Sequence, residues 1–189
     1  MNNNQCRDLF LTGPPSTGKS TLVEKLVILA SGKGLRIEGF FTPEVRERGR
    51  RVGFDLQVIN GPRVPLARRT PLGDPSLKFA GYFLNPRASE VFRSHLPLDA
   101  PEEGLLVLDE IGPMELYVPG GREYFHEVLG KAKGPLLGVV HRKLSHHDPR
   151  LHRLATARSI IVDLGKTTWE EALAGSVKWL EDCVIPRTR

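Results

Sequence analysis

The stretch of sequence that decides the fold is LFLTGPPSTGKST, residues 9–21. It starts with Leu9-Phe10-Leu11, a short apolar run typical of a buried strand. Gly13–Ser20 then fits the pattern G-x-x-x-x-G-K-[ST] without a gap. The apolar residues that follow recur with the period of a helix, and they are Leu22, Val23, Leu26, Leu29 and Ala30. The motif therefore stands between a strand and a helix, the context in which it binds phosphate.

The residue types of this glycine-rich loop suit a phosphate site. Gly13 and Gly18 let the backbone curl so that successive N–H groups point at phosphate oxygens, and the start of the following helix favours the same anion. Lys19 is placed to reach the β- and γ-phosphates and to stabilise charge there, and Ser20 to ligate Mg²⁺. We expect nucleotide contacts from the whole loop, which comprises Gly13, Pro14, Pro15, Ser16, Thr17, Gly18, Lys19, Ser20 and Thr21.

A second segment combines an apolar run with two carboxylates. Leu105–Leu108 is apolar throughout, as expected for a strand buried on both faces of a parallel sheet, and it ends in Asp109 and Glu110. Because ligands bind beyond the carboxyl ends of such strands, we expect both carboxylates beside the glycine-rich loop. Asp109 is the expected Mg²⁺ partner, acting with Ser20. Glu110 is the candidate base that takes or orients the proton of an attacking water.

The rest of the chain predicts an α/β fold with a mostly parallel sheet flanked by helices. The first helix is expected to end near Gly32-Lys33-Gly34, and residues 35–42 to form the next strand of a right-handed crossover. Residues 43–83 predict an inserted antiparallel β-meander with a turn at Asn60-Gly61-Pro62. Its expected strands are Val45-Arg46, Val52–Val58, Arg63–Ala67 and Lys78–Phe83.

Beyond the meander, local signals predict five further elements and a turn. We expect a helix capped by Asn85-Pro86, a turn at Gly112-Pro113, a helix over 122–130, strands over 136–140 and 159–162, and a last helix that begins with the capping box of Thr168 and Glu171. The buried stripe predicted for this last helix is Trp169, Leu173, Val177 and Leu180. A role for Trp169 in stacking on a nucleotide base is an open alternative.

Length and composition predict one domain over residues 1–189. Hydrophobic residues make up 40% and charged residues 26% of the 189, ordinary values for a globular protein. The sequence has no apolar stretch near the roughly 20 residues of a membrane span, and its polar start, Met1–Gln5, lacks the apolar core of a signal peptide. Cys6 and Cys183 form no metal-binding spacing, which suits a reducing compartment. We expect a cytoplasmic monomer with a short loose N-terminus and no membrane partner.

The positive charge of the chain leaves two interpretations open. A net charge of +5 is explained by a nucleotide ligand, and nucleic acid is compatible with it but not required. The arginines of the meander either reach phosphate from the rim of the site or, as we favour, are solvated charges that blunt a sheet edge. These are Arg46, Arg48, Arg50, Arg51, Arg63, Arg68 and Arg69.

Several later residues are candidates without a decided role. His141 and Arg142 follow the strand expected at 136–140, where a side chain can sense the γ-phosphate, and the arginines that follow offer further candidates in Arg150, Arg153 and Arg158. The histidines at 141, 146, 147 and 152 are too loosely spaced for zinc, so we expect a basic surface loop there. Glu115 either lies near the site or pairs with an arginine.

Six sequence blocks together resemble the small P-loop nucleoside-triphosphatase family, which includes thermophile proteins and the human cancer-related nucleoside-triphosphatase. The blocks are LTGPPSTGKST (11–21), GFFTPEVR (39–46), RVGFD (51–55), LAR (66–68), AGYFLN (80–85) and LLVLDEIGPMEL (105–116). The combination of the second block with the last is more specific than the glycine-rich loop alone. The likeness fades after residue 145, so the last part of the chain inherits no residue roles.

The resemblance implies a RecA-like or AAA-like P-loop core that hydrolyses nucleoside triphosphates, among them ATP and GTP, to diphosphate and phosphate, with Mg²⁺ and broad base preference. It also implies that residues 105–112 form the second nucleotide-contacting segment, which includes Asp109, Glu110, Ile111 and Gly112. Two alternatives stay open: a nucleoside or small-molecule kinase, and a nucleic-acid-coupled ATPase switch. Phosphate release without an added acceptor separates the hydrolase from the kinase, and stimulation by single-stranded nucleic acid indicates the switch.

Overall fold

A computed structural model describes residues 8–185, and the predictions made for Met1–Gln5 and Cys6 lie outside these residues. The strands are β1 (Asp8–Thr12), β2 (Arg36–Phe41), β3 (Glu44–Glu47), β4 (Arg50–Val58), β5 (Arg63–Arg68), β6 (Lys78–Phe79), β7 (Tyr82–Leu84), β8 (Gly104–Ile111), β9 (Leu136–Val140) and β10 (Ser159–Asp163). The helices are α1 (Lys19–Gly32), α2 (Ala88–Ser94), α3 (Pro113–Tyr117), α4 (Gly121–Lys131), α5 (Leu144–His147), α6 (Pro149–Ala157) and α7 (Trp169–Cys183). Within residues 8–185, none of these helices has the length and apolar character needed to cross a membrane.

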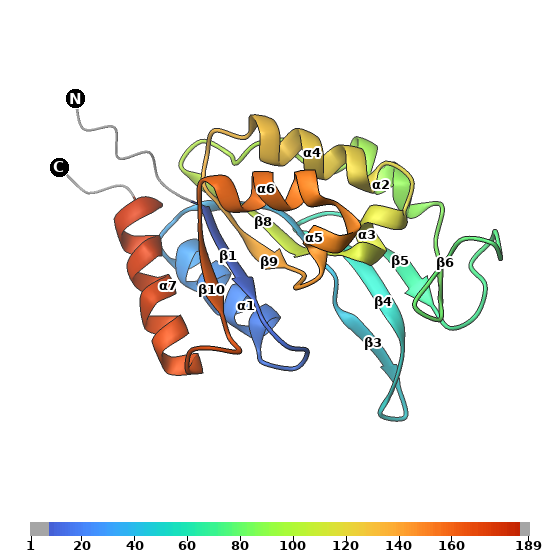
Figure 1. Ribbon diagram of the computed structural model, residues 1–189. Coiled ribbons are helices and arrows are strands. Elements are labelled where there is room, and N and C mark those ends of the chain that lie inside the picture. The colour runs from blue at the N-terminus through green and yellow to red at the C-terminus, as the bar shows by residue number, and fades with distance from the viewer. Residues whose placement is uncertain (1–7, 186–189) are drawn as a thin grey trace.

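The strands form one sheet with a parallel half and an antiparallel half (Figure 1). Its order is β10-β1-β9-β8-β2-β4-β5-β7-β6, and β3 pairs with β4. The strands from β10 to β2 are parallel, whereas β4, β5, β7 and β6 continue the sheet as antiparallel neighbours. The α/β fold and the inserted β-meander are therefore confirmed. The sheet is mixed instead of mostly parallel, because the meander extends it beyond β2; the RecA-like or AAA-like assignment stays a prediction.

Helices cover both faces of the sheet. Figure 1 shows α1 and α7 on one face and α2, α4 and α6 on the other. Because side chains alternate along a strand, β1 contributes to both layers. Phe10 packs in a cluster with Phe40 and Phe125, while Leu11 belongs to a second cluster with Leu22 of α1. Burial on both faces is what the continuous apolar runs of β1, β8 and β9 predicted.

Two predicted helix faces are correct only in part. Leu29 of α1 was predicted to share the apolar face of the helix and is 43% exposed, whereas its helical neighbours Leu26 and Ala30 are fully buried. On α7 the residues with the least exposure are Ala172, Ser176, Trp179 and Leu180. Of the predicted stripe, only Leu180 is fully buried, and the other three side chains pack at the edge of the core. The buried face of α7 is therefore turned from the predicted stripe toward Ala172, Ser176 and Trp179.

Two local predictions between residues 78 and 88 are wrong. The stretch predicted as one strand, 78–83, instead begins two short strands, β6 and β7, which reverse at Ala80-Gly81 and end at Leu84; both residues of the reversal have positive φ (49° and 81°). The next helix, α2, begins at Ala88 and not at Pro86. Asn85 still acts as a cap, because its Oδ1 accepts a hydrogen bond from the Arg87 N–H at 3.1 Å, but it caps a separate turn before the helix.

The stretch predicted as a basic surface loop folds into α5 and α6. Asp148 starts α6: its side chain accepts a hydrogen bond from the Leu151 N–H at 2.9 Å, and Pro149 occupies the first turn. Arg122 and His126 of α4 both contact the Asp148 carboxylate and anchor this helix start. The Gly112-Pro113 step likewise opens helix α3 and is not a simple turn.

Candidate active site

The glycine-rich loop joins β1 to α1 at the carboxyl edge of the sheet. Gly13 and Gly18 have φ values of +136° and +83°, which other residues rarely adopt. Packing closes the same two positions to side chains. A Cβ at Gly13 would lie 3.2 Å from the backbone nitrogen of Gly165, and one at Gly18 would lie 3.0 Å from Nε1 of Trp169. The two glycines are therefore needed for backbone shape and for close packing, and Trp169 lies against the loop.

Lys19 lies over this loop. Its ammonium donates to the carbonyl oxygens of Gly13 at 3.2 Å and Pro14 at 2.7 Å. The Thr17 hydroxyl also donates to the Pro14 carbonyl, at 2.9 Å, and braces the loop from within. Lys19 is the first residue of α1, so its positive charge stands at the helix end where the backbone N–H groups point outward.

Asp109 and Ser20 lie side by side although they come from separate parts of the chain. Asp109 is in β8, and Ser20 is in the first turn of α1, which follows β1 and the loop. Strand β9 lies between β1 and β8, and Asp109 is close to the end of β8 with only 4% of its surface exposed. Burial raises the pKa of the Asp109 carboxyl to about 6, against a hydrogen bond from the Ser20 side chain and the charge of Lys19. The predicted proximity of the two residues is therefore present. A hydroxyl and a carboxylate side by side form an oxygen donor pair of the kind that Mg²⁺ prefers.

Glu110 follows Asp109 in β8 and is partly exposed. Burial raises the pKa of its carboxyl to about 7, the charge of Asp109 adds to the rise, and Lys19 opposes it. The pairing of β8 with β9 shifts register between Leu108 and Ile111, which is the part of the strand that carries both acids. Glu110 is thus a carboxyl whose proton is exchangeable near neutral pH, in a site that also contains a lysine.

Glu115 is the third carboxyl of this site. The sequence left its place open; the structure buries it at the start of α3, beside Glu110. A Cβ added to Gly112 would lie 2.7 Å from Oε1 of Glu110 and 2.9 Å from Oε2 of Glu115, so the two carboxyls flank this glycine. The same Glu115 oxygen is buried without a hydrogen-bond partner. Burial and the charge of Glu110 raise the pKa of Glu115 well above its usual value.

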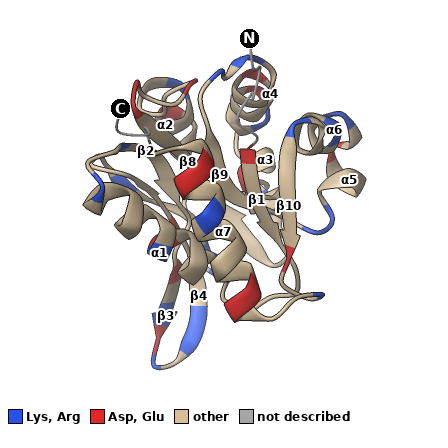
Figure 2. Ribbon diagram, turned by 90° about the vertical axis from the view of Figure 1, so that its left-hand side faces the viewer, with Lys and Arg blue, Asp and Glu red and all other residues tan. Residues whose placement is uncertain are grey.

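The meander arginines interact mainly within the meander. Arg63 and Arg68 both contact the buried carboxylate of Asp55. Arg46 and Arg51 contact Glu44 in the adjoining hairpin, and Arg69 lies over the ring of Tyr82. Figure 2 shows the β3–β4 hairpin extending from the sheet with basic residues along it. These contacts fit the interpretation of edge-blunting charges better than that of arginines reaching the loop.

The histidines of the last third fall into separate surroundings. His147 packs edge-on against Phe79 and Tyr117. His141 and His152 line a cavity, and burial lowers the pKa of His141, with nearby cations such as Lys19 acting in the same direction. Across residues 8–185 there is no group of three or more His, Cys, Asp or Glu side chains arranged to hold a metal ion.

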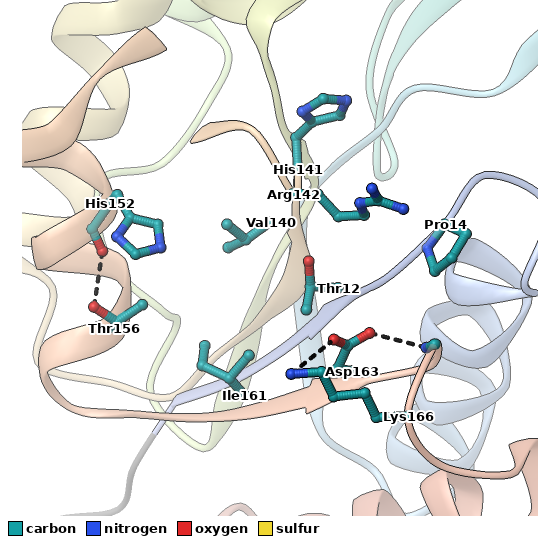
Figure 3. A pocket seen from close by; sticks show the side chains of 11 residues that line it. Thr12, Pro14, Val140, His141, Arg142, His152, Thr156, Ile161, Asp163 and Lys166 are labelled. Carbon is teal, nitrogen blue, oxygen red and sulfur yellow. Dashed lines mark hydrogen bonds and ion pairs between the residues drawn. The ribbon is translucent and has the colours of Figure 1, made fainter. Parts of the chain in front are cut away.

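A cavity of about 450 Å³ next to the loop was not foreseen. It lies between α6 and the ends of β1, β9 and β10 (Figure 3). Arg142 follows β9 and Thr156 belongs to α6, while Asp163 and Lys166 come from the end of β10 and the turn after it. The available sequence signal was that three predicted strands end together at one edge, each followed by polar residues. The order β10-β1-β9, which makes them neighbours, could not be predicted from that signal.

The fold and the site define a mixed α/β protein in which a glycine-rich loop and a buried acidic strand end share one sheet edge. A family model described as NTPase matches residues 8–174. The chain belongs to this NTPase family.

Individual relatives agree with this assignment. The chain is 39% identical over 168 residues to the nucleoside-triphosphatase THEP1 of Ignicoccus hospitalis, a match that covers 87% of this chain and 94% of that protein. It is 38% identical over 142 residues to the human cancer-related nucleoside-triphosphatase, covering 71% of this chain and 75% of that protein; for the mouse homolog the share covered is 63% of its length. A solution structure of a human cancer-related nucleoside triphosphatase aligns with a TM-score of 0.66 at 28% identity, over 93% of this chain and 98% of that one.

Proposed function

We propose that this chain is a Mg²⁺-dependent nucleoside-triphosphatase that converts ATP, GTP and other nucleoside triphosphates to diphosphate and phosphate with broad base preference. One observation carries the proposal: Lys19, the Ser20–Asp109 pair and the Glu110 carboxyl of pKa about 7 meet at one edge of the sheet. Membership of the NTPase family, and relatives named nucleoside-triphosphatases, support it.

The glycine-rich loop is the proposed phosphate site. Its backbone N–H groups and the start of α1 offer donors and a positive dipole end to the phosphate oxygens. The Lys19 ammonium is already held over the loop by two carbonyl oxygens. Replacing these neutral carbonyl acceptors by negatively charged phosphate oxygens turns the bonds of the ammonium into ion pairs. Lys19 therefore both binds the substrate and stabilises charge that develops in the transition state.

Ser20 and Asp109 fit a Mg²⁺ ion by their chemistry and their proximity. Mg²⁺ is usually held by one or two protein carboxylates together with phosphate oxygens and water, so this small donor set is sufficient. When bound, the ion supplies neutralising charge to the β- and γ-phosphate oxygens. Asp109 would hold it in the ionised form of its carboxyl, and the Ser20 hydroxyl would supply a second oxygen.

Glu110 is the proposed base. Its carboxylate accepts the proton of a water molecule whose oxygen attacks the γ-phosphorus, while the bond from that phosphorus to the β–γ bridging oxygen breaks and the diphosphate leaves. A base works best when its pKa lies near the operating pH, and burial beside Asp109 gives Glu110 that property. Gly112 and Ile111, next to it, are proposed contacts of the same segment.

The proposal is tested by phosphate release from ATP, GTP and CTP, with and without Mg²⁺ and without any acceptor. We expect Mg²⁺-dependent release from all three, and none from Lys19→Ala, which loses phosphate binding. Glu110→Gln should keep nucleotide affinity and lose about 10²- to 10⁴-fold in rate. Glu127→Gln is the matched control, because Glu127 lies on the surface of α4 and pairs with Lys131.

Two results would contradict the proposal. No release from wild type until a hydroxyl acceptor is added would indicate a kinase. Release only with single-stranded nucleic acid would indicate a coupled switch. If affinity and rate fell together in Glu110→Gln, the role of Glu110 would be structural and not that of the base.

A further inference from the structure

The cavity beside the glycine-rich loop has no role in the reaction described so far. It is bounded by the loop itself through Pro14 and by Thr12, the last residue of β1. The backbone on its other side is also tied to the loop, because Gly13 lies against Leu164 and Gly165. A ligand with its phosphates in the loop therefore has this cavity as an adjoining space of about 450 Å³.

The lining of the cavity suits a flat heteroaromatic group with polar edges. Its apolar part is formed by Val140, Ile161 and the ring of Pro14, and its polar part comes from side chains around them (Figure 3). Arg142 and Lys166 bring positive charge on flexible stems, and both are exposed. Binding sites for small molecules typically combine an apolar lining with a few polar groups in this way.

We propose that this cavity is the subsite for the nucleoside part of the substrate, with the base against Ile161 and Val140 and under the Arg142 guanidinium. The inference rests on the proposed function, and it assigns the base and ribose to a place that the phosphate loop does not fix. A guanidinium stacks on any of the common bases, since every base has a π-face. The subsite therefore binds bases without selecting among them, which accounts for broad base preference.

Two polar side chains of the lining, Thr156 and Asp163, are already engaged in bonds within the protein. The Thr156 hydroxyl already donates to the carbonyl of His152 at 2.9 Å, and Asp163 Oδ1 already accepts from the Gly165 N–H at 2.9 Å. Strong discrimination among bases needs buried polar groups left unpaired by the wrong base. Here the Thr156 hydroxyl and one oxygen of Asp163 are already bonded within the protein, so a change of base costs little.

Strand β10 offers a matched pair of variants to test the subsite. Ile161 lines the cavity and is 40% exposed, while its neighbour Ile160 is 39% exposed and points to the opposite face. Ile161→Trp fills the cavity, and Ile160→Trp adds the same bulk outside it. Affinities for ADP, GDP and CDP, each with Mg²⁺, are compared by calorimetry with the affinity for pyrophosphate, which has no nucleoside.

We expect Ile161→Trp to weaken all three nucleotides by about tenfold or more and pyrophosphate by less than about twofold. Ile160→Trp should change the affinity for none of the four ligands by more than about twofold. Equal losses for nucleotides and pyrophosphate in Ile161→Trp would overturn the subsite, and so would unchanged nucleotide affinity. If wild type fails to bind pyrophosphate and nucleotides at all, it is the proposed function that fails.

A second pair tests the subsite without altering any packed side chain. Arg142 and Lys143 are adjacent and exposed, but only Arg142 lines the cavity. Arg142→Ala should weaken ADP, GDP and CDP alike, by about threefold to tenfold, and leave pyrophosphate unchanged, while Lys143→Ala leaves all four unchanged. A loss confined to a non-hydrolysable triphosphate would make Arg142 a γ-phosphate sensor and would contradict the proposed contact with the base.

Discussion

The ionised form of Glu110 is useful for chemistry and unfavourable for folding. Its usual pKa is 4.5, and burial beside Asp109 raises the pKa to about 7 in the folded chain. Between these two values the folded chain holds a proton that the unfolded chain has lost. The stabilising contribution of the protonated group is therefore fully present below about pH 4.5 and is lost as the pH rises to about 7. Above that, the folded protein carries an ionised carboxylate that is only partly exposed to water.

The first prediction follows from the direction of this pKa shift. Glu110→Gln removes the ionisable group, so the variant should be more stable than wild type at pH 8 by about 2 kcal/mol, with the difference vanishing near pH 4. Denaturant unfolding of both proteins without nucleotide, at a series of pH values, measures it. Glu127→Gln, at an exposed position of α4, should show no such trend. An equal stability gap for Glu110→Gln at both ends of the pH range would mean that packing, and not ionisation, distinguishes the two side chains.

At the scale of single elements, Asp148 determines where α6 begins. Burial of its carboxyl works against ionisation, but hydrogen bonds from Leu151 N–H and His126, together with the Arg122 charge, hold the pKa of Asp148 below its usual value. A lowered pKa means that the stabilisation is present above the unfolded pKa and is lost as the pH falls through the folded one. The carboxylate both caps the helix and ties it to α4.

Replacing Asp148 separates these two contributions. Asp148→Asn keeps an oxygen that can cap the helix but loses the charge, and Asp148→Ala loses both. We expect Asp148→Ala to lower the free energy of unfolding at pH 7 by about 2 kcal/mol and Asp148→Asn by about half as much. Unfolding by denaturant at pH 7 and pH 3 checks this, because Asp148→Asn should approach wild type at the lower pH, where the charge is being lost, while Asp148→Ala stays less stable than both for want of a cap. Equal loss in both variants at pH 7 would assign the effect to the charge alone.

The elements that the sequence predicted are those whose signals are local. The loop motif between Leu11 and Leu22 and the capping box at Thr168 each act over a few residues, and the structure has both where expected. The reversal at Ala80-Gly81 was missed because only one of its two positive-φ residues is a glycine. Helix α6 was missed although Asp148-Pro149 is a cap followed by a proline, since the helix is only nine residues long and carries many polar and charged side chains.

In the candidate site, too, the residues with local sequence signals were predicted and those placed by distant contacts were not. Lys19, Ser20, Asp109 and Glu110 were predicted to meet because each follows a recognisable strand, and strand ends gather at one edge. Glu115 could not be placed, since its position beside Glu110 depends on the short helix α3 turning the chain back. To predict the cavity one must know the strand order β10-β1-β9, which arises from pairings between residues more than a hundred positions apart. Such contacts leave no local pattern.

At the scale of the whole molecule, the two edges of the parallel sheet have different roles: one carries the candidate site and the other joins the strand starts. The carboxyl edge holds the loop, the acids and the cavity. At the amino edge, Arg158 joins the starts of three strands: its Nε donates to Asp8 of β1 at 2.7 Å, and its other nitrogens donate to the carbonyls of Ala132 and Gly134, just before β9. The same Asp8 carboxylate accepts from the Leu136 N–H of β9 at 3.1 Å. Asp8 is 2% exposed, and within residues 8–185 the cation paired with this buried carboxyl is Arg158.

The last prediction is that a mutation at the amino edge lowers the stability of the fold without changing nucleotide binding at the carboxyl edge. Arg158→Lys keeps the charge but cannot reproduce the fork that spans Asp8 and two carbonyls, so we expect the free energy of unfolding to fall by about 2 to 3 kcal/mol. Affinity for ADP with Mg²⁺, measured below the unfolding transition, should stay within about twofold of wild type, because no nucleotide contact is expected at the amino edge. Arg153→Lys, on the exposed side of α6, is the control and should change neither value. A large loss of nucleotide affinity in folded Arg158→Lys would mean that the strand starts and the loop are coupled through β1, and that the amino edge takes part in setting the site.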